Sequence, residues 1–163
     1  AGDVLIINDG STTFHLASCL GGRGRMTVYT NSIAMVAELS RFPDIRLFVM
    51  GGEYHADMFY LGGSLMERVL ETIQADIVFL GTDAIDRQGR CLVEDQDVAR
   101  TTQMMLRRGR RKILLADSAK LEAAGTVVYG SLRDFDLWIT SRLPDREAYR
   151  RFHKQTEIKE EEI

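Results

Sequence analysis

The sequence predicts an α/β fold with a mostly parallel sheet and crossover helices on both of its faces. Short apolar runs alternate with longer amphipathic stretches from the first residues onward, and this alternation is typical of successive β-α units. The apolar runs are hydrophobic at consecutive positions, as expected for strands that are covered on both faces. There is no internal repeat and no low-complexity linker, so we expect residues 1–163 to form one domain.

Six apolar runs are the expected strands of this sheet: Val4 to Asn8, Thr27 to Thr30, Arg46 to Val49, Ile77 to Gly81, Lys112 to Ala116 and Leu137 to Thr140. Between them, apolar residues recur at helical spacing. This spacing predicts crossover helices at Thr12 to Leu20, Ser32 to Ser40, Ser64 to Ile73 and Val98 to Arg108.

Three stretches do not follow the alternation. The segment Gly51 to Gly63 is predicted to be a long loop, and ordered loops of this length are often functional. The segment Asp83 to Asp97 contains a turn signal and predicts a hairpin or an irregular excursion. After Pro144 we expect one short helix, followed at Thr156 to Ile163 by either an edge strand or a frayed acidic tail.

Composition and charge exclude several classes of protein. With 24 acidic and 21 basic residues the net charge is -3, which gives no general attraction to nucleic acid phosphates. No apolar run approaches the roughly 20 residues of a membrane span, and no signal peptide opens the chain. Cys19 and Cys91 lack metal-ligand spacing and are interpreted as free thiols. We therefore expect a soluble cytoplasmic protein without membrane contact, metal or cofactor.

The segment from Leu5 to Thr13 is the most informative motif. An apolar strand ends there in a turn that contains Asp9 and Gly10, followed by the hydroxyl residues Ser11, Thr12 and Thr13. Backbone N–H groups at the start of a helix favour an anion, and a glycine lets the main chain approach a phosphate closely. The motif is thus a candidate phosphate cradle. The alternative is that a hydroxyl residue only caps the helix.

Polar or glycine residues also follow the later strands. Parallel α/β sheets bind ligands beyond the carboxyl ends of their strands, so these residues are expected to converge on one crevice. Strand-to-helix turns commonly use the same residue types, which is the structural alternative for each member. The candidate binding residues from these strand ends are Thr30, Asn31, Gly51, Gly52, Gly81, Asp83 and Lys120.

The order and spacing of these motifs resemble the effector-sensing domain of DeoR-type bacterial transcriptional repressors. The resemblance spans residues 2 to about 142. It rests on Asp9 to Thr13, Thr30 to Ser32, Gly51-Gly52, Gly62, Phe79 to Asp86, Leu115 to Lys120 and Ile139-Thr140. It implies a domain that binds a phosphorylated sugar or related metabolite and relays occupancy to an N-terminal winged helix-turn-helix. That DNA-binding part is expected to precede Ala1, so DNA would be contacted only through it.

The same segments resemble ribose-5-phosphate isomerase more distantly, and this implies an isomerase-like sensor fold. In that enzyme the Gly-Ser-Thr loop holds the phosphate, and catalysis also needs a carboxylate base on the helix before the strand that ends at Asp117. The matching position here is Thr102. Loss of a general base typically lowers a rate by about 10² to 10⁴-fold, so we expect binding without catalytic residues. A small sugar-phosphate isomerase remains the alternative, with Glu94, Asp95 or Asp97 as substitute base.

Two further features concern partners. The cations from Arg107 to Lys112 end a helix and enter a strand, where they complement the helix dipole; a contact with DNA or with the missing domain is the alternative. The apolar stretch Asp57 to Leu61 is expected either to fold over a bound ligand or to pack on another subunit. We expect a homo-oligomer, and an oligomerisation module with a vestigial pocket is a third possibility.

Overall fold

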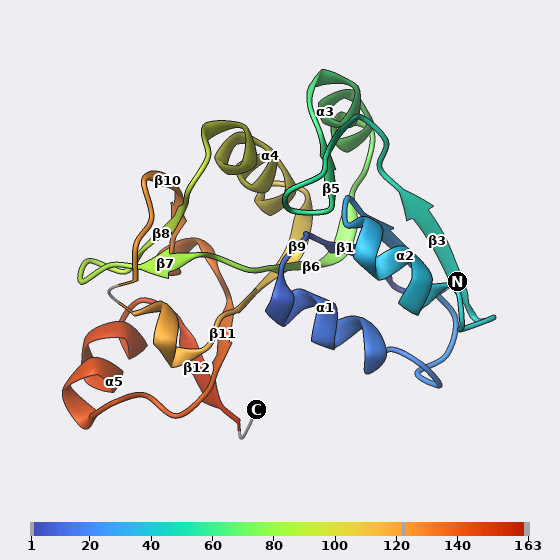
Figure 1. Cartoon of the computed structure of the whole chain (residues 1–163). Helices are drawn as coiled ribbons and strands as arrows, with labels where there is room; N and C mark the ends of the chain where they lie inside the picture. The colour runs from blue at the N-terminus through green and yellow to red at the C-terminus, as the bar shows by residue number, and fades with distance from the viewer. Residues whose placement is uncertain (1, 122, 162–163) are drawn as a thin grey trace.

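A seven-stranded parallel sheet forms the centre of the computed structural model, which describes residues 2–121 and 123–161 (Figure 1). Its strand order is β12-β11-β9-β6-β1-β2-β3, and every neighbouring pair is parallel. All the predicted strands are present, which confirms the α/β class. The strands are β1 (Val4–Ile7), β2 (Met26–Thr30), β3 (Ile45–Val49), β6 (Ala75–Leu80), β9 (Gly109–Leu115), β11 (Leu137–Thr140) and β12 (Glu157–Glu160).

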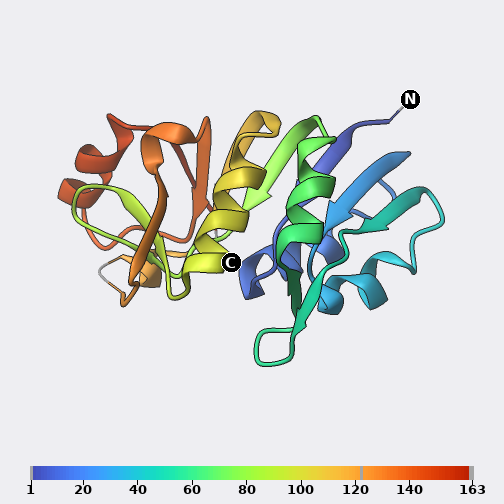
Figure 2. The same ribbon diagram turned by 90° about the horizontal axis from the view of Figure 1, so that it is seen from above.

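Helices cover both faces of this sheet. Figures 1 and 2 show α1 and α2 on one face and α3 and α4 on the other, with α5 beside the β12 edge. The predicted crossover helices are thus confirmed, and their bounds differ from the expected ones by a few residues. The helices are α1 (Ser11–Ser18), α2 (Ile33–Leu39), α3 (Ser64–Glu71), α4 (Gln96–Leu106) and α5 (Arg146–His153).

Strand β1 shows why the apolar runs are continuous. Leu5 and Ile7 pack in the cluster formed with α1 and α2, whereas Ile6 lies in the cluster formed with α3 and α4. Each of the three side chains is at most 5% exposed. A strand buried on both faces needs apolar residues at consecutive positions, so its sequence shows no alternation.

Two smaller antiparallel sheets complete the fold. Gly51 to Gly63 is not the predicted loop but contains a hairpin of β4 (Glu53–His55) and β5 (Tyr60–Gly62). The segment Asp83 to Asp97 contains the predicted hairpin, with β7 (Ala84–Ile85) paired to β8 (Arg90–Val93). The sequence did not indicate β10 (Val127–Ser131), which pairs with β8.

The end of the chain forms a strand rather than a frayed tail. β12 pairs in parallel with β11 and is an edge of the large sheet. The expected segment was Thr156 to Ile163. Its last two positions, 162 and 163, lie outside the described residues.

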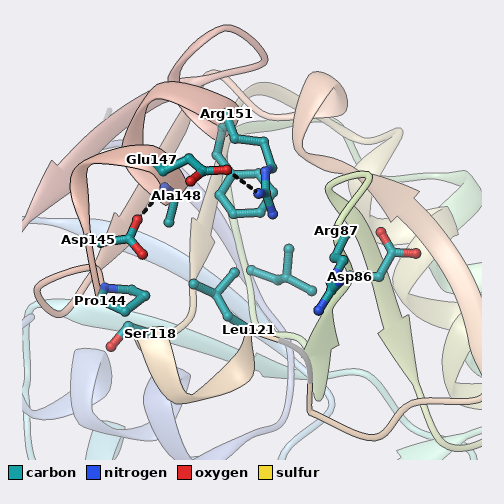
Figure 3. Close-up of a pocket in the computed structure, with 11 residues that line it drawn as sticks. Asp86, Arg87, Ser118, Leu121, Pro144, Asp145, Glu147, Ala148 and Arg151 are labelled. Carbon is teal, nitrogen blue, oxygen red and sulfur yellow. Dashed lines mark hydrogen bonds and ion pairs between the residues drawn. The ribbon is translucent and has the colours of Figure 1, made fainter.

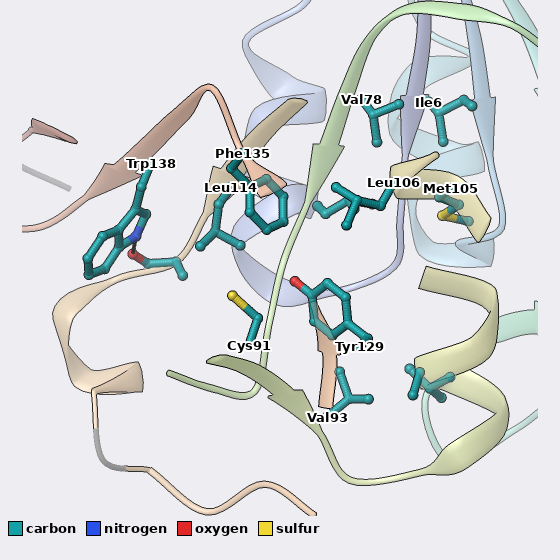
Figure 4. Packing of buried hydrophobic residues seen from close by; sticks show 14 of the residues in the cluster. Ile6, Val78, Cys91, Val93, Met105, Leu106, Leu114, Tyr129, Phe135 and Trp138 are labelled. Carbon is teal, nitrogen blue, oxygen red and sulfur yellow. Dashed lines mark hydrogen bonds between the residues drawn. The ribbon is translucent and has the colours of Figure 1, made fainter. Parts of the chain in front are cut away.

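Two buried aromatic side chains form hydrogen bonds at the strand ends of the large sheet, one from the smaller sheet with β10 and one from the large sheet itself (Figure 4). The Tyr129 hydroxyl of β10 donates a hydrogen bond to the Gly81 carbonyl, just beyond β6, at 2.9 Å. The Trp138 indole of β11 is fully buried and donates to the Ala116 carbonyl, just beyond β9, at 2.8 Å. Both bonds therefore fix the position of a strand end.

Several predictions about the surface can be compared with the coordinates. Cys19 is exposed and Cys91 is buried, and both are free cysteines. Arg110 of the cationic run forms an ion pair with Asp76 at 3.6 Å, and Arg108 donates to the Glu71 carbonyl. None of the described helices is both long and apolar enough to cross a membrane.

Candidate functional site

The candidate site lies where the strand order reverses. The chain runs outward from β1 to β2 and β3, and then returns to the other side of β1 with β6. In open parallel sheets this switch point leaves a crevice beyond the strand ends. Asn8 joins the two strand ends, because its backbone N–H donates to the Phe79 carbonyl at 3.3 Å and its side-chain oxygen accepts from Gly81 N at 2.9 Å.

Helix α1 begins directly after β1 without a side-chain cap. Its N-cap residue is Gly10, which has a φ of 140°, a conformation that glycine adopts without strain. Among the described residues, the backbone N–H groups of Ser11, Thr12 and Thr13 have no hydrogen-bond partner. The Thr13 hydroxyl instead braces the turn by donating to the carbonyls of Asn8 and Gly10. The turn therefore holds a rigid set of unused donors.

These donors border a small cavity of about 70 Å³. Lys120 reaches it from the 3₁₀ turn Ser118–Lys120 that follows β9. The Lys120 ammonium forms no ion pair with any residue that the structure describes. The cavity thus combines a helix start and a free cation. Its lining residues are Asn8, Asp9, Gly10, Ser11, Thr12, Thr13, Met58, Gly81, Thr82, Asp83, Val93, Val98 and Lys120.

Two carboxyl groups also line the cavity. Burial raises the pKa of the Asp9 carboxyl, and the Asp83 carboxylate adds to this effect, although hydrogen bonds from Asn31 and from the backbone oppose it. Asp83 accepts a hydrogen bond from Glu94 N at 3.2 Å. Carboxyl oxygens at these two positions can bind the hydroxyl groups of a polar ligand.

Eight of the twelve candidate residues predicted from the sequence border this cavity, and four do not. Thr30 is fully buried, and its hydroxyl contacts the Met35 sulfur and accepts from Ser32 N. Asn31 is also buried and contacts Asp9 rather than the cavity. Gly51 is exposed away from the cavity, and Gly52 packs closely against the Gly62 carbonyl. These four residues therefore belong to the segments next to the cavity and do not line it.

Sequence reasoning did not identify five of the lining residues. Asn8 and Thr82 are next to predicted members, so their position at the strand ends was a usable signal. Met58, Val93 and Val98 come from the β4–β5 hairpin, β8 and α4. Met58 belongs to the apolar stretch Asp57 to Leu61, which was expected to fold over a ligand or to pack on another subunit. The presence of Val93 and Val98 depends on how distant elements approach one another, which no local pattern reports.

A larger cavity of about 410 Å³ lies beside α5 (Figure 3). It borders the same 3₁₀ turn through Ser118, but most of its polar groups already have partners. Glu147 forms an ion pair with Arg151 at 3.1 Å, and Asp145 accepts from Ala148 N at 2.7 Å. The Ser118 hydroxyl is bonded to that of Ser141. This cavity is therefore less suited to a charged ligand than its smaller neighbour.

Metal binding finds no support in the described part of the chain. Within residues 2–121 and 123–161, no group of three or more His, Cys, Asp or Glu side chains is arranged to hold a metal ion. The donors of the candidate site are amide N–H groups, hydroxyls and one ammonium, which suit an anion rather than a cation.

Comparison with known protein families identifies the chain. The family described as the DeoR C-terminal sensor domain matches residues 1–142. The chain belongs to this family. The resemblance that the motifs indicated is thus confirmed, and the chain is a DeoR-type sensor domain.

The curated relatives are named as transcriptional regulators. The HTH-type transcriptional regulator GlpR of Haloferax volcanii is 29% identical over 147 residues, which are 90% of this chain and 57% of the relative. The HTH-type transcriptional repressor GlcR of Bacillus subtilis is 30% identical over 86% of this chain and 54% of the relative. The sensor domain thus spans about half the length of the curated relatives that it matches.

Solved structures confirm the isomerase-like fold. Ribose 5-phosphate isomerase A of Methanocaldococcus jannaschii has a TM-score of 0.51 at 17% identity, over 74% of this chain and 47% of that one. The eIF2B beta structure from Chaetomium thermophilum has a TM-score of 0.55 at 15% identity, over 84% of this chain and 44% of that one. Likeness at such low identity concerns the fold alone.

Proposed function

We propose that this sensor domain binds a phosphorylated sugar or a related metabolite in the small cavity at the β1 and β6 strand ends. The observation that carries the proposal is the convergence on one cavity of the uncapped start of α1 and the Lys120 ammonium, which has no ion-pair partner within residues 2–121 and 123–161. Unsatisfied N–H groups and the helix dipole favour a phosphate at such a place. Gly10 keeps the turn free of a side chain, so a phosphate can approach the backbone closely.

The available donors are sufficient for useful affinity. Each hydrogen bond that involves a charged group contributes about 1.5 to 3 kcal/mol. Three amide N–H groups and the Lys120 ammonium together give about 6 to 12 kcal/mol on this scale, a range that includes the roughly 8 kcal/mol of micromolar binding. In this arrangement Asp9 and Asp83 bind hydroxyl groups of the sugar.

Calorimetric titration tests this assignment. Ribose 5-phosphate and glucose 6-phosphate are compared with free ribose and free glucose. The proteins are the wild type, Lys120→Met and the matched control Lys154→Met, which changes an exposed lysine at the C-terminal end of α5. We expect at least one phosphorylated sugar to bind, the free sugars not to bind, and Lys120→Met alone to weaken affinity by about tenfold or more. A wild type that binds only unphosphorylated ligands, or equal affinity in both variants, contradicts the proposal.

We also propose that the domain acts without catalysis. Thr102, at the position of the isomerase base, is 2% exposed inside α4 and does not line the cavity. A threonine hydroxyl does not relay protons between sugar carbons near neutral pH as a carboxylate does. An assay of aldose-ketose interconversion separates the two functions, because turnover that Lys120→Met abolishes favours the isomerase.

In the whole protein, we propose that occupancy of the cavity controls DNA binding through a helix-turn-helix domain outside this sequence, in the cytoplasm. Residues 1–163 then serve as the sensor domain. Binding alters DNA affinity only if the ligand prefers one of two states of the full protein. Expression with the upstream region and a DNA-binding assay with and without ligand tests this step.

We further propose that the domain self-associates. Six large apolar side chains on α2, α3 and the β4–β5 hairpin are more than a third exposed, and large exposed apolar surface commonly marks a protein interface. These side chains are Ile33, Tyr54, Met58, Phe59, Leu65 and Val69. Light scattering at several concentrations tests self-association, and a monomer throughout contradicts it.

A further inference from the structure

The Asn31 side chain forms hydrogen bonds with both the Asp9 turn and the β4–β5 hairpin. It follows β2 directly and is 1% exposed. Its side-chain oxygen accepts from Asp9 N at 3.0 Å, and its side-chain nitrogen donates to Asp9 Oδ1 at 2.9 Å. The same nitrogen donates to the Leu61 carbonyl at 3.3 Å. One amide group thus bonds to two separate segments.

The backbone around Asn31 strengthens this connection. Leu61 N donates to the Asn31 carbonyl at 2.8 Å, and Ile33 N donates to the Phe59 carbonyl at 2.9 Å. Ser32 forms an isolated bridge with Tyr60. An isolated two-stranded hairpin is at best marginally stable in water. The hairpin is therefore held by this anchor at residues 31–33 together with Tyr60, which is 4% exposed and packs in the main hydrophobic cluster.

The tip of the hairpin is both a wall of the cavity and a strained segment. Met58 lines the cavity and is 44% exposed. Phe59 has a φ of 54°, which is unfavourable for a residue other than glycine, and is 58% exposed. A tip with an exposed aromatic side chain in this conformation is held by its anchors rather than by its own packing.

The enclosed part of the cavity is smaller than a typical ligand pocket. A volume of about 70 Å³ is well below the roughly 300 Å³ at which small-molecule pockets begin. Strands β1 and β6 are fixed in the centre of the large sheet. The hairpin tip lies at the periphery of the large sheet and is held by few hydrogen bonds. Moving the tip therefore costs less free energy than moving one of these strands.

We propose that Asn31 is a positioning residue that couples Asp9 to the β4–β5 hairpin, so that the hairpin changes its order when the cavity is occupied. This inference rests on the proposed function, because it names the segment that reports the bound sugar phosphate. Asparagine suits the position because its side chain both donates and accepts. A ligand that draws Asp9 toward itself changes the bonds of Asn31 and, through them, the anchor of the hairpin.

Hydrogen–deuterium exchange on the ligand-free domain tests the coupling without a ligand. Asp9→Ala removes the carboxyl oxygen that accepts from the Asn31 amide and keeps the backbone N–H that donates to it. The matched control Asp83→Ala changes the other carboxyl of the same cavity, which contacts Glu94 N. We expect the amides of Leu61 and Ile33 to exchange about fivefold faster in Asp9→Ala, and at the wild-type rate in Asp83→Ala. Equal exchange at these amides in all three proteins, or equal acceleration in both variants, overturns the proposal.

A second measurement covers the case in which Asp9→Ala loses its fold. In a Cys19→Ser background, Met58→Cys places a thiol on the hairpin tip, while Cys91 stays buried. We expect a maleimide to label this thiol several-fold faster when Asn31→Ser is added, and unchanged labelling when Ser32→Ala is added instead. Identical labelling of Asn31→Ser and its parent overturns the coupling.

Addition of ribose 5-phosphate or glucose 6-phosphate then separates this inference from the proposed function. A sugar phosphate that binds by calorimetry and alters hairpin exchange in the wild type, but alters it less in Asn31→Ser, supports both. Binding without any change in the hairpin overturns the coupling and leaves the proposed function intact. A hairpin that loosens in Asp9→Ala while no sugar phosphate binds supports the coupling and contradicts the proposed ligand.

Discussion

Two helix starts that border cavities in this domain, those of α1 and α5, differ in how their N–H groups are satisfied. Helix α5 begins after Asp145, whose carboxylate accepts from Ala148 N at 2.7 Å. Helix α1 begins after Gly10, which has no side chain to cap its N–H groups. The start of α5 is therefore capped by a side chain of this domain, whereas the N–H groups at the start of α1 stay available for an anion.

The comparison shows that cavity volume and unused hydrogen-bonding capacity do not coincide in this domain. The cavity beside α5 has about 410 Å³, against about 70 Å³ at the start of α1. In the larger cavity Glu147 and Arg151 satisfy each other. In the smaller one the Lys120 ammonium has no ion-pair partner among the described residues. Unused hydrogen-bonding capacity, rather than space, distinguishes the candidate site.

The strongest test of this contrast adds a carboxylate to the start of α1, which has no side-chain cap. Ser11→Asp places a negative charge at the first residue of α1, where it suits the helix dipole but repels a phosphate. We expect sugar phosphate affinity to fall by about 100-fold while thermal stability is kept or raised. Ser64→Asp is the matched control, because Ser64 likewise begins α3 after a glycine without a side-chain cap. Unchanged affinity in calorimetric titration of Ser11→Asp contradicts the proposed phosphate position.

A smaller effect is expected at the start of α5, which Asp145 caps. Asp145→Ala removes the cap of α5 and lowers the free energy of unfolding by about 1 kcal/mol, measured by urea denaturation. Asp44→Ala changes an exposed aspartate that caps no helix and serves as control. Sugar phosphate affinity is expected to be the same in both variants and in the wild type. If Asp145→Ala weakens binding instead, the larger cavity takes part in ligand recognition.

The smallest effect concerns the pH dependence of stability. Because burial raises the pKa of Asp9 from its ordinary value near 3.8, the folded state binds more protons than the unfolded state just above that pH. The wild type therefore loses stability relative to Asp9→Asn as pH rises from 3.8 through the raised pKa. Melting temperatures of both proteins from acidic to neutral pH measure the trend. A difference that does not change with pH shows that Asp9 is ionised alike in both states.

The framework of the fold followed from sequence because its signals are local. Each strand of the large sheet that is buried on both faces shows as an apolar run, and the helices between them show as periodic stretches. Strand β10 was missed because it pairs with β8, more than 30 positions away, and the run Val127 to Ser131 contains a glycine and two polar or aromatic positions. Its strand character comes from that distant partner.

The candidate site was predictable in part for the same reason. The turn from Asp9 to Thr13 carries its chemistry within one short segment, so its place beside a cavity could be anticipated. Thr30 and Asn31 have the same residue types as a binding turn, but their side chains point to Met35 and Asp9. Residue type therefore indicated the neighbourhood of the site, whereas the direction of each side chain depended on tertiary packing.

The hydrogen bond between Trp138 and the Ala116 carbonyl makes this tryptophan an intrinsic fluorescence probe. The sequence has one tryptophan, and its indole donates to the residue just before the turn that carries Lys120. Its emission therefore arises from a single dry environment, adjacent to the segment that supplies the cation. Fluorescence titration can follow that segment in the unlabelled protein when the excitation wavelength is one that tryptophan absorbs and tyrosine does not.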